Sequence, residues 1–174
     1  MKADSWFREH MGEFGGEIRF DEALARHTYY RIGGPARWVL IPASIEDLQW
    51  IRRGLQAEGC AWFILGLGSN ILASDIGFAG AVIKTSRLGP QKMEEIDSGR
   101  LRTGAGVAIS SLLRRASSSG WGGLEFLAGI PGSVGGVVRM NAGTHLGEAK
   151  DAIVKVEAYD LNGADADLGL TYED

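Results

Sequence analysis

Two glycine-rich segments carry the residue types in this sequence that are best suited to holding a ligand. The first spans residues 66–70 and the second residues 129–136, and each follows an apolar run. Glycine has no Cβ, so backbone N–H groups in such loops can approach a ligand closely and point at its oxygen atoms. Two such loops, about sixty residues apart, favour a long anionic ligand held at several points, such as a dinucleotide.

Neither of two familiar phosphate motifs is present in the first loop. A dinucleotide fingerprint needs a third glycine three residues after Gly68, where Ile71 stands, and a Walker A loop needs a Gly-Lys-Ser/Thr run. In the second loop, Gly135 and Gly136 are expected to permit positive φ. From residue types alone, the first loop is as compatible with a plain turn as with a phosphate site. The second, taken alone, fits a tight structural crossover slightly better.

Composition sets limits on the class of protein. The 174 residues fit one domain or two small lobes, and the formal net charge of −4 argues against nucleic acid as the main partner. The single cysteine, Cys60, excludes an intrachain disulfide and fits a reducing compartment. The three histidines are too scattered for a metal site, and no stretch approaches the ~20 apolar residues of a membrane span. We therefore expect a cytoplasmic protein that binds neither a membrane nor a metal.

The elements that must position the first loop form a small α/β unit. Strands are predicted over residues 36–41 and 62–65, with a helix between them that starts at Ser44 and stops at Gly59. Ser44 and Asp47 have the spacing of a capping box, and the two strands are expected to be parallel. A short helix over residues 5–11 precedes this unit.

The second loop follows a different set of elements. The pattern predicts a strand over 81–84, a hairpin of 93–97 with 100–103, and a helix over 107–119. A strand over 152–160 is expected to return through Asn162-Gly163 as a strand over 164–170. Gly89-Pro90 marks a predicted boundary between two lobes, and the lack of a cap or tail at Asp174 suggests a cut inside a larger protein.

Four segments in order resemble a known family. They are HTYYRIGG at 27–34, GLGSN at 66–70, GIPGSVGG at 129–136 and MNAG at 140–143. Together they are similar to the UDP-N-acetylenolpyruvoylglucosamine reductases, known as MurB, over roughly residues 24 to 174. Each motif alone is weak, whereas the ordered set is specific.

The resemblance implies a two-lobed α+β domain of the PCMH type, the flavin fold of vanillyl-alcohol oxidase, without a substrate domain. It divides the chain into an N-terminal extension (1–23), a first lobe (24–88) and a second lobe (89–174) that is truncated at its C-terminus. It also implies FAD as the cofactor and no metal. The implied contacts are Gly66, Leu67, Gly68, Ser69, Asn70, Gly129, Ile130, Pro131, Gly132, Ser133, Gly135, Gly136, Asn141, Ala142, Gly143 and Ile153.

Each group of contacts has its own implied role. The first loop would cradle the FAD pyrophosphate, and the second would run beside the pyrophosphate and the isoalloxazine. Residues 141–143 and Ile153 would line the remaining surface, including the adenine end. Thr28 and the turn at 31–34 would help to close the first lobe around the cofactor.

The family reaction reduces UDP-N-acetylenolpyruvoylglucosamine with NADPH, a step of peptidoglycan synthesis and so of cell-wall formation, cell shape and division. The family's Tyr-Arg arginine, serine acid and late glutamate would all lie beyond Asp174. The resemblance therefore places no catalytic residue in this chain, which we expect to be inactive alone. Two alternatives remain: another flavin oxidoreductase of the same fold, or a non-catalytic flavin- or nucleotide-binding module.

Overall fold

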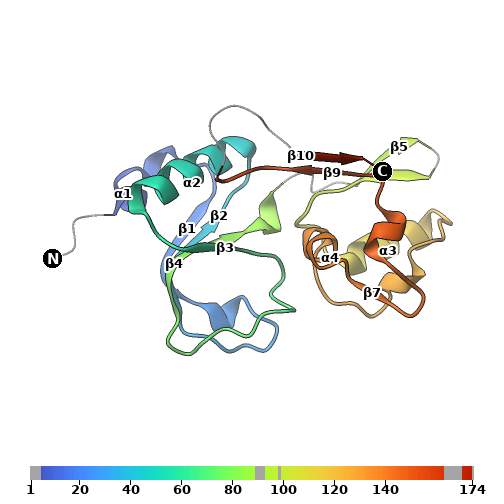
Figure 1. The fold of residues 1–174 in the computed structure, drawn as a ribbon, viewed down its shortest axis with the longest axis horizontal. Coiled ribbons are helices and arrows are strands. Elements are labelled where there is room, and N and C mark those ends of the chain that lie inside the picture. The colour runs from blue at the N-terminus through green and yellow to red at the C-terminus, as the bar shows by residue number, and fades with distance from the viewer. Residues whose placement is uncertain (1–4, 89–92, 98, 163–169, 174) are drawn as a thin grey trace.

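The computed structural model describes residues 5–88, 93–97, 99–162 and 170–173. They form a mixed α+β structure, as predicted, with two groups of elements joined by extended chain (Figure 1). The first group contains a four-stranded sheet and the helices α1 (Trp6–Glu9) and α2 (Ile45–Glu58). The second contains α3 (Ile109–Ser118), α4 (Val134–Met140) and short hairpins.

The sheet of the first group has the strand order β1-β2-β4-β3. Its strands are β1 (Glu17–Ala23), β2 (Pro35–Ile41), β4 (Phe78–Lys84) and β3 (Trp62–Leu65). β2 and β3 both run parallel to β4, which lies between them, so their predicted shared direction is confirmed. β1 pairs antiparallel with β2. It escaped prediction because an edge strand needs little apolar pattern, and four of its seven residues are charged.

Helix α2 begins and ends where the sequence predicts. The Ser44 hydroxyl accepts a hydrogen bond from the Asp47 N–H, and the Asp47 carboxylate accepts one from the Ser44 N–H, which completes the capping box. Gly59 adopts φ +54° just past the last turn, a conformation that favours glycine. These local signals therefore determine both helix ends.

Successive residues of β2 point to opposite faces of the sheet, and both faces are buried. Trp38 and Leu40 pack toward α2, whereas Val39 and Ile41 belong to a second cluster on the other face. A strand covered on both faces reads as a continuous apolar run in the sequence. That explains why β2 was readily predicted.

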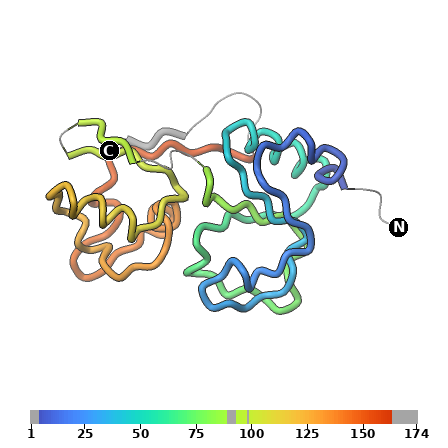
Figure 2. Tube along the Cα trace, turned by 180° about the vertical axis from the view of Figure 1, so that it is seen from behind, coloured from blue at the N-terminus to red at the C-terminus, as the bar shows by residue number. Residues whose placement is uncertain are grey.

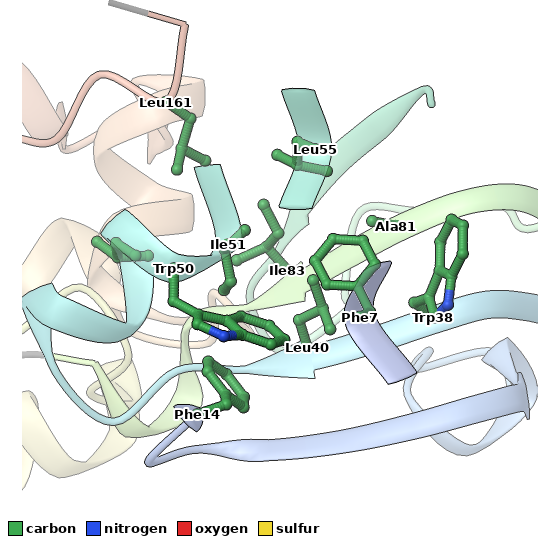
Figure 3. Packing of buried hydrophobic residues seen from close by; sticks show 11 residues of the cluster. Phe7, Phe14, Trp38, Leu40, Trp50, Ile51, Leu55, Ala81, Ile83 and Leu161 are labelled. Atoms are coloured by element: carbon green, nitrogen blue, oxygen red, sulfur yellow. The ribbon is translucent and has the colours of Figure 1, made fainter. Parts of the chain in front are cut away.

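The N-terminal segment completes the core beneath α2 (Figure 3). The ring centroid of Phe7, which is fully buried, lies 5.1 Å from that of Trp38. Phe14 stacks on Trp50 at 4.6 Å. Burial of an aromatic side chain such as Phe7 stabilises the fold by roughly 1.5–3 kcal/mol. Residues 5–23, expected as an extension, thus supply α1, β1 and part of the core.

The second group opens with the predicted hairpin, in which β5 (Glu94–Asp97) pairs antiparallel with β6 (Arg100–Arg102). Helix α3 follows and buries Ile109, Leu112 and Ala116. Two further hairpin strands, β7 (Gly143–Thr144) and β8 (Gly147–Glu148), pair after α4. The helix prediction for 107–119 is therefore confirmed, with ends two residues and one residue shorter.

The strand predicted over 152–160 is shorter than expected. A 3₁₀ turn, Ala149–Ala152, occupies its start, and β9 spans only Lys155–Ala158. β10 (Leu170–Glu173) pairs antiparallel with β9. Residues 163–169, which include most of the predicted turn and return strand, and the Gly89-Pro90 boundary lie outside the described residues.

After β9 the chain returns toward the first group (Figure 2). Leu161 is buried in the cluster beneath α2, and Tyr159 packs against the same cluster. The last described segments therefore contact the core formed by the first. In the part of the chain that the structure describes, no helix has the length and apolarity required to cross a bilayer.

Candidate functional site at the junction of two glycine loops

The two glycine loops meet although they are far apart in the sequence. The Ser69 hydroxyl donates a hydrogen bond to the carbonyl oxygen of Pro131 at 3.0 Å. Gly66 faces Ser133 so closely that a Cβ on Gly66 would lie 2.5 Å from the Ser133 hydroxyl oxygen. The junction thus places backbone from both groups of elements side by side.

The first loop leaves the carboxyl end of β3 and rests on the segment after β1. Gly68 has φ +69°, and a Cβ there would lie 2.1 Å from the carbonyl oxygen of His27. The Tyr29 N–H donates to the Gly68 carbonyl at 2.9 Å. Both the backbone angle and the lack of space therefore require glycine at this position.

Neighbouring backbone anchors the second loop. The Ile109 N–H donates to the Gly132 carbonyl at 3.0 Å, and the Val134 N–H donates to the Val107 carbonyl at 2.9 Å. Gly129 and Gly132 adopt positive φ. The Ser133 hydroxyl, 1% exposed, accepts from the Gly136 N–H and caps α4. This part of the loop is therefore held by α4 and by the start of α3.

Gly135 and Gly136, which were expected to permit positive φ in a loop, do not adopt it. Both residues lie in the first turn of α4, which the sequence analysis interpreted as loop because adjacent glycines disfavour a helix. Gly135 is required for close packing instead, since a Cβ would lie 2.8 Å from that of Ala105. Its N–H donates to the Ala105 carbonyl.

A third glycine contact supports the junction from the end of β4. A Cβ on Gly106 would lie 2.2 Å from the Thr85 carbonyl oxygen and 3.0 Å from the Ser86 Cα. The segment after β4 therefore touches the loop that leads into α3. This contact brings the carboxyl end of the parallel strands beside the second group, where open α/β sheets usually bind ligands.

The first loop contains backbone N–H groups that are available as hydrogen-bond donors. Within the described residues, the N–H groups of residues 67–70 donate to no protein acceptor. Leu67 and Asn70 are exposed, while Gly66 and Ser69 are partly buried. Convergent free N–H groups in a glycine turn form a concavity suited to phosphate oxygens. The geometry therefore fits an anionic group such as a diphosphate.

Comparison with known proteins decides the family. Residues 36–168 match the model of a family described as FAD binding domain. This chain belongs to that FAD binding domain family. FAD is accordingly the cofactor.

Relatives and solved structures agree with this result. The chain is 43% identical over 130 residues to the UDP-N-acetylenolpyruvoylglucosamine reductase of Pelobacter propionicus, covering 75% of this chain and 43% of the relative. It is 44% identical over 140 residues to that of Halalkalibacterium halodurans, covering 80% and 46%. The similarity to the MurB reductases is thus confirmed, and the chain spans about half the length of the curated relatives it matches.

The solved structures show the same fold. MurB of Thermus caldophilus matches with TM-score 0.65 and 31% identity, over 91% of this chain and 52% of that one. A BBE-like 1 variant of Physcomitrella patens matches with TM-score 0.67 and 15% identity, over 96% and 37%. The predicted PCMH-type flavin fold is confirmed by these neighbours.

The predicted cofactor contacts Asn141, Gly143 and Ile153 each make contacts within the protein. The Asn141 amide donates to Glu148 Oε2 at 2.9 Å and accepts from the Lys150 N–H at 3.0 Å. A Cβ on Gly143 would lie 2.3 Å from the Gly147 carbonyl oxygen, and Ile153 packs against the cluster around α3. The Asn141 side chain thus shapes the β7–β8 hairpin.

One buried group near the first loop was missed. His27 is 7% exposed and lies between Glu22 and Lys84. Burial and the charge of Lys84 lower the pKa of His27. No local signal could have revealed this arrangement, because Lys84 is 57 residues away. Among the described residues, no group of three His, Cys, Asp or Glu side chains could hold a metal ion.

Proposed function

We propose that this chain forms the FAD-binding portion of a UDP-N-acetylenolpyruvoylglucosamine reductase. The contact between Ser69 and Pro131 carries the proposal, because it joins the two loops whose donors suit one extended anionic cofactor. The names of relatives at 43–44% identity support the substrate class. The part of those relatives that this chain does not cover supplies the substrate-handling groups.

In this proposal the cofactor lies between a lobe of residues 24–88 and a lobe of residues 89–174. Residues 66–70 hold its pyrophosphate through backbone N–H groups, with Ser69 and Asn70 adding side-chain donors. Residues 129–136 run beside the pyrophosphate and the isoalloxazine. Backbone at 141–143 and the side chain of Ile153 line the rest of the cofactor, including its adenine end.

The proposed reaction is the reduction of the enolpyruvyl double bond with NADPH, which yields UDP-N-acetylmuramate for peptidoglycan synthesis in the cytoplasm. When bound, FAD supplies the hydride-transfer chemistry between the two substrates. This chain binds and orients the cofactor and contributes no catalytic side chain. That places the protein among the processes of cell-wall formation, cell shape and cell division.

Visible absorbance of the purified chain tests the cofactor site directly. The chain is mixed with FAD, desalted and scanned, and we expect retained flavin absorbance. The matched control is Gly68→Ala, whose Cβ would lie 2.1 Å from the His27 carbonyl oxygen and so displace the first loop; it should elute without flavin. A folded wild-type chain that elutes colourless would contradict the proposed site.

A second measurement tests the reaction. The chain with FAD is mixed with NADPH and UDP-N-acetylenolpyruvoylglucosamine, first alone and then within a full-length relative whose first half it replaces. We expect turnover only in the chimaera. An active chimaera that reduces a different enol ether but not this substrate would contradict the substrate assignment and leave the cofactor site standing.

A further inference from the structure

A buried polar row lies behind the first glycine loop. His27 Nε2 lies 3.1 Å from Glu22 Oε1, and His27 Nδ1 lies 3.0 Å from Lys84 Nζ. Glu22 comes from β1 and Lys84 ends β4, so the row links an edge strand to a central strand of the sheet. The His27 side chain is only 4% exposed. Burying a titratable ring costs free energy of folding unless both of its nitrogen atoms form hydrogen bonds.

The two partners assign the protonation state of the ring. The Lys84 ammonium has only donors, so Nδ1 must accept, and the Glu22 carboxylate accepts a hydrogen bond from the Nε2–H. This is the neutral ring with its proton on Nε2. A second proton on Nδ1 would remove the acceptor and set two positive charges 3.0 Å apart.

The surrounding charges come from β1 itself and from the turns after β1 and β4. Arg19 on β1 and Arg26 in the turn after β1 both pair with Glu22. Glu17 also lies on β1, where it pairs with Arg19 and with Arg87 from the turn after β4. Burial comes first in lowering the pKa of His27, and the positive charge of Lys84 lowers it further. Burial and Arg19 likewise lower the pKa of Lys84.

The backbone of His27 supports the cofactor loop. Its carbonyl oxygen would lie 2.1 Å from a Cβ on Gly68, and two residues further on the Tyr29 N–H donates to the Gly68 carbonyl. The Thr28 hydroxyl donates to the Ile32 carbonyl and closes the turn that follows. The position of the His27 ring and the position of the first loop are therefore coupled through a few backbone atoms.

We propose that His27 is a positioning residue: its neutral ring, held between Glu22 and Lys84, fixes the backbone of residues 27–29 against Gly68 and so presents the first loop to the FAD diphosphate. This inference rests on the proposed cofactor site. It makes the presentation of that loop depend on the protonation of a side chain that need not touch the cofactor. The contact with Lys84 is the link that a second proton on the ring breaks.

The test uses two readouts on the purified chain. Hydrogen exchange measures the protection factor of the Tyr29 amide without FAD, and flavin fluorescence measures the Kd for FAD. As the pH falls from neutral through the lowered pKa of His27, we expect both protection and affinity to fall, because the ring then gains its second proton. The loss of about one hydrogen bond predicts changes of roughly three- to tenfold.

Two substitutions separate the contacts of the ring. His27→Asn keeps an acceptor toward Lys84 and cannot be protonated, so it should abolish the pH dependence of Tyr29 protection. His27→Gln places its amide nitrogen near the position of Nε2 and keeps a donor toward Glu22, but it has no acceptor at the position of Nδ1. It should therefore show low protection at every pH. Lys84→Met removes the repelling charge and should raise the pH midpoint of the ring titration followed by NMR. His10→Gln is the matched control, because His10 stacks on Trp6 and takes no part in the contacts of His27.

The outcomes distinguish the inference from the proposed function. Tyr29 protection that is independent of pH in the wild-type chain and unchanged in both His27 variants would overturn the positioning role, even if FAD binds. Protection that responds as expected in a chain that never binds FAD would uphold the coupling of ring and loop and contradict the proposed cofactor site. The wild-type titration needs no substitution, so a variant that fails to fold does not block the test.

Discussion

Gly66 and Ser133 are in contact at the point where the two glycine loops meet. A Cβ on Gly66 would lie 2.5 Å from the Ser133 hydroxyl oxygen but 3.7 Å from the Ser133 Cβ. The conflict is therefore with the hydroxyl alone. Gly66 is also not among the residues with positive φ, so alanine suits its backbone.

This geometry predicts a non-additive pair of substitutions. Gly66→Ala should destabilise the chain through the clash, and Ser133→Ala should cost about 1 kcal/mol through the lost cap of α4. The double variant should be more stable than the sum of the two changes by about 1 kcal/mol, because the two Cβ atoms then make an ordinary contact. Urea unfolding of the four proteins measures the coupling, and strictly additive values would show that the loops do not meet as described.

Ser69→Ala should weaken FAD binding more than it weakens the fold. The substitution removes the hydrogen bond to Pro131 that links the loops at an exposed position, so the free energy of unfolding should fall by no more than about 1 kcal/mol. Flavin fluorescence should show a Kd raised about three- to tenfold. Ser117→Ala, on the exposed side of α3, is the control and should leave the Kd unchanged. Equal Kd values for both variants would contradict a role of the link in binding.

Comparing Gly68→Ala with Gly59→Ala separates the effect of backbone strain from the effect of crowding in the first loop. Both glycines have positive φ, so alanine should cost each about 1–2 kcal/mol. Only Gly68 is also crowded, whereas a Cβ on Gly59 meets nothing within 4 Å. We expect Gly68→Ala to abolish FAD retention and Gly59→Ala to retain it. Loss of FAD in both variants would point to general destabilisation instead.

Asp47→Ala should be among the most destabilising single changes in the first group. The carboxylate is buried and accepts hydrogen bonds from the N–H groups of Gly15 and Ala43 at 2.8 Å and from Ser44 at 3.2 Å. Each hydrogen bond to a charged acceptor contributes about 1.5–3 kcal/mol, so losing three of them should cost at least about 2 kcal/mol in urea unfolding. Glu46→Ala, at the exposed neighbouring position, should change stability little, and similar losses in the two would contradict this account.

Stability should fall as the pH is lowered below about 6.5. The pKa of His27 is lower in the folded chain than the ordinary 6.5, so the unfolded chain binds a proton first and gains stability relative to the folded one. The loss grows until the pH reaches the folded pKa and then levels off. Urea unfolding across this range measures the slope.

Two comparisons isolate the histidine in that experiment. His27→Asn should flatten the slope between about pH 6.5 and the lower pKa, since asparagine does not titrate. Burial alone would raise the pKa of Glu22, but hydrogen bonds from Arg19 and His27 lower it. The stabilisation from Glu22 is therefore lost only below its ordinary 4.5, in a separate window. An unchanged slope in His27→Asn would contradict the assignment to this ring.

Short-range sequence signals predicted many of the helix ends and strands of this protein. The capping box at Ser44, the stop at Gly59 and the apolar runs of β2 and β3 were recognised because each depends on residues a few positions apart. Helix α4 was missed because the contact that accounts for its glycines is distant in the sequence. Helix α4 contains adjacent glycines that are required by the packing of Gly135 on Ala105, a contact thirty residues away that outweighs their poor helix propensity.

By itself, the sequence determined the two glycine loops, the helices and strands with strong local patterns, and an ordered motif set that identified the flavin fold. Only the tertiary structure decided that β4 lies between β2 and β3, that Ser69 reaches Pro131, and that His27 is buried between Glu22 and Lys84. Those contacts join residues brought together by sheet order and by packing of the two groups. Burial and charge at such positions depend on distant neighbours, so no local pattern encodes them.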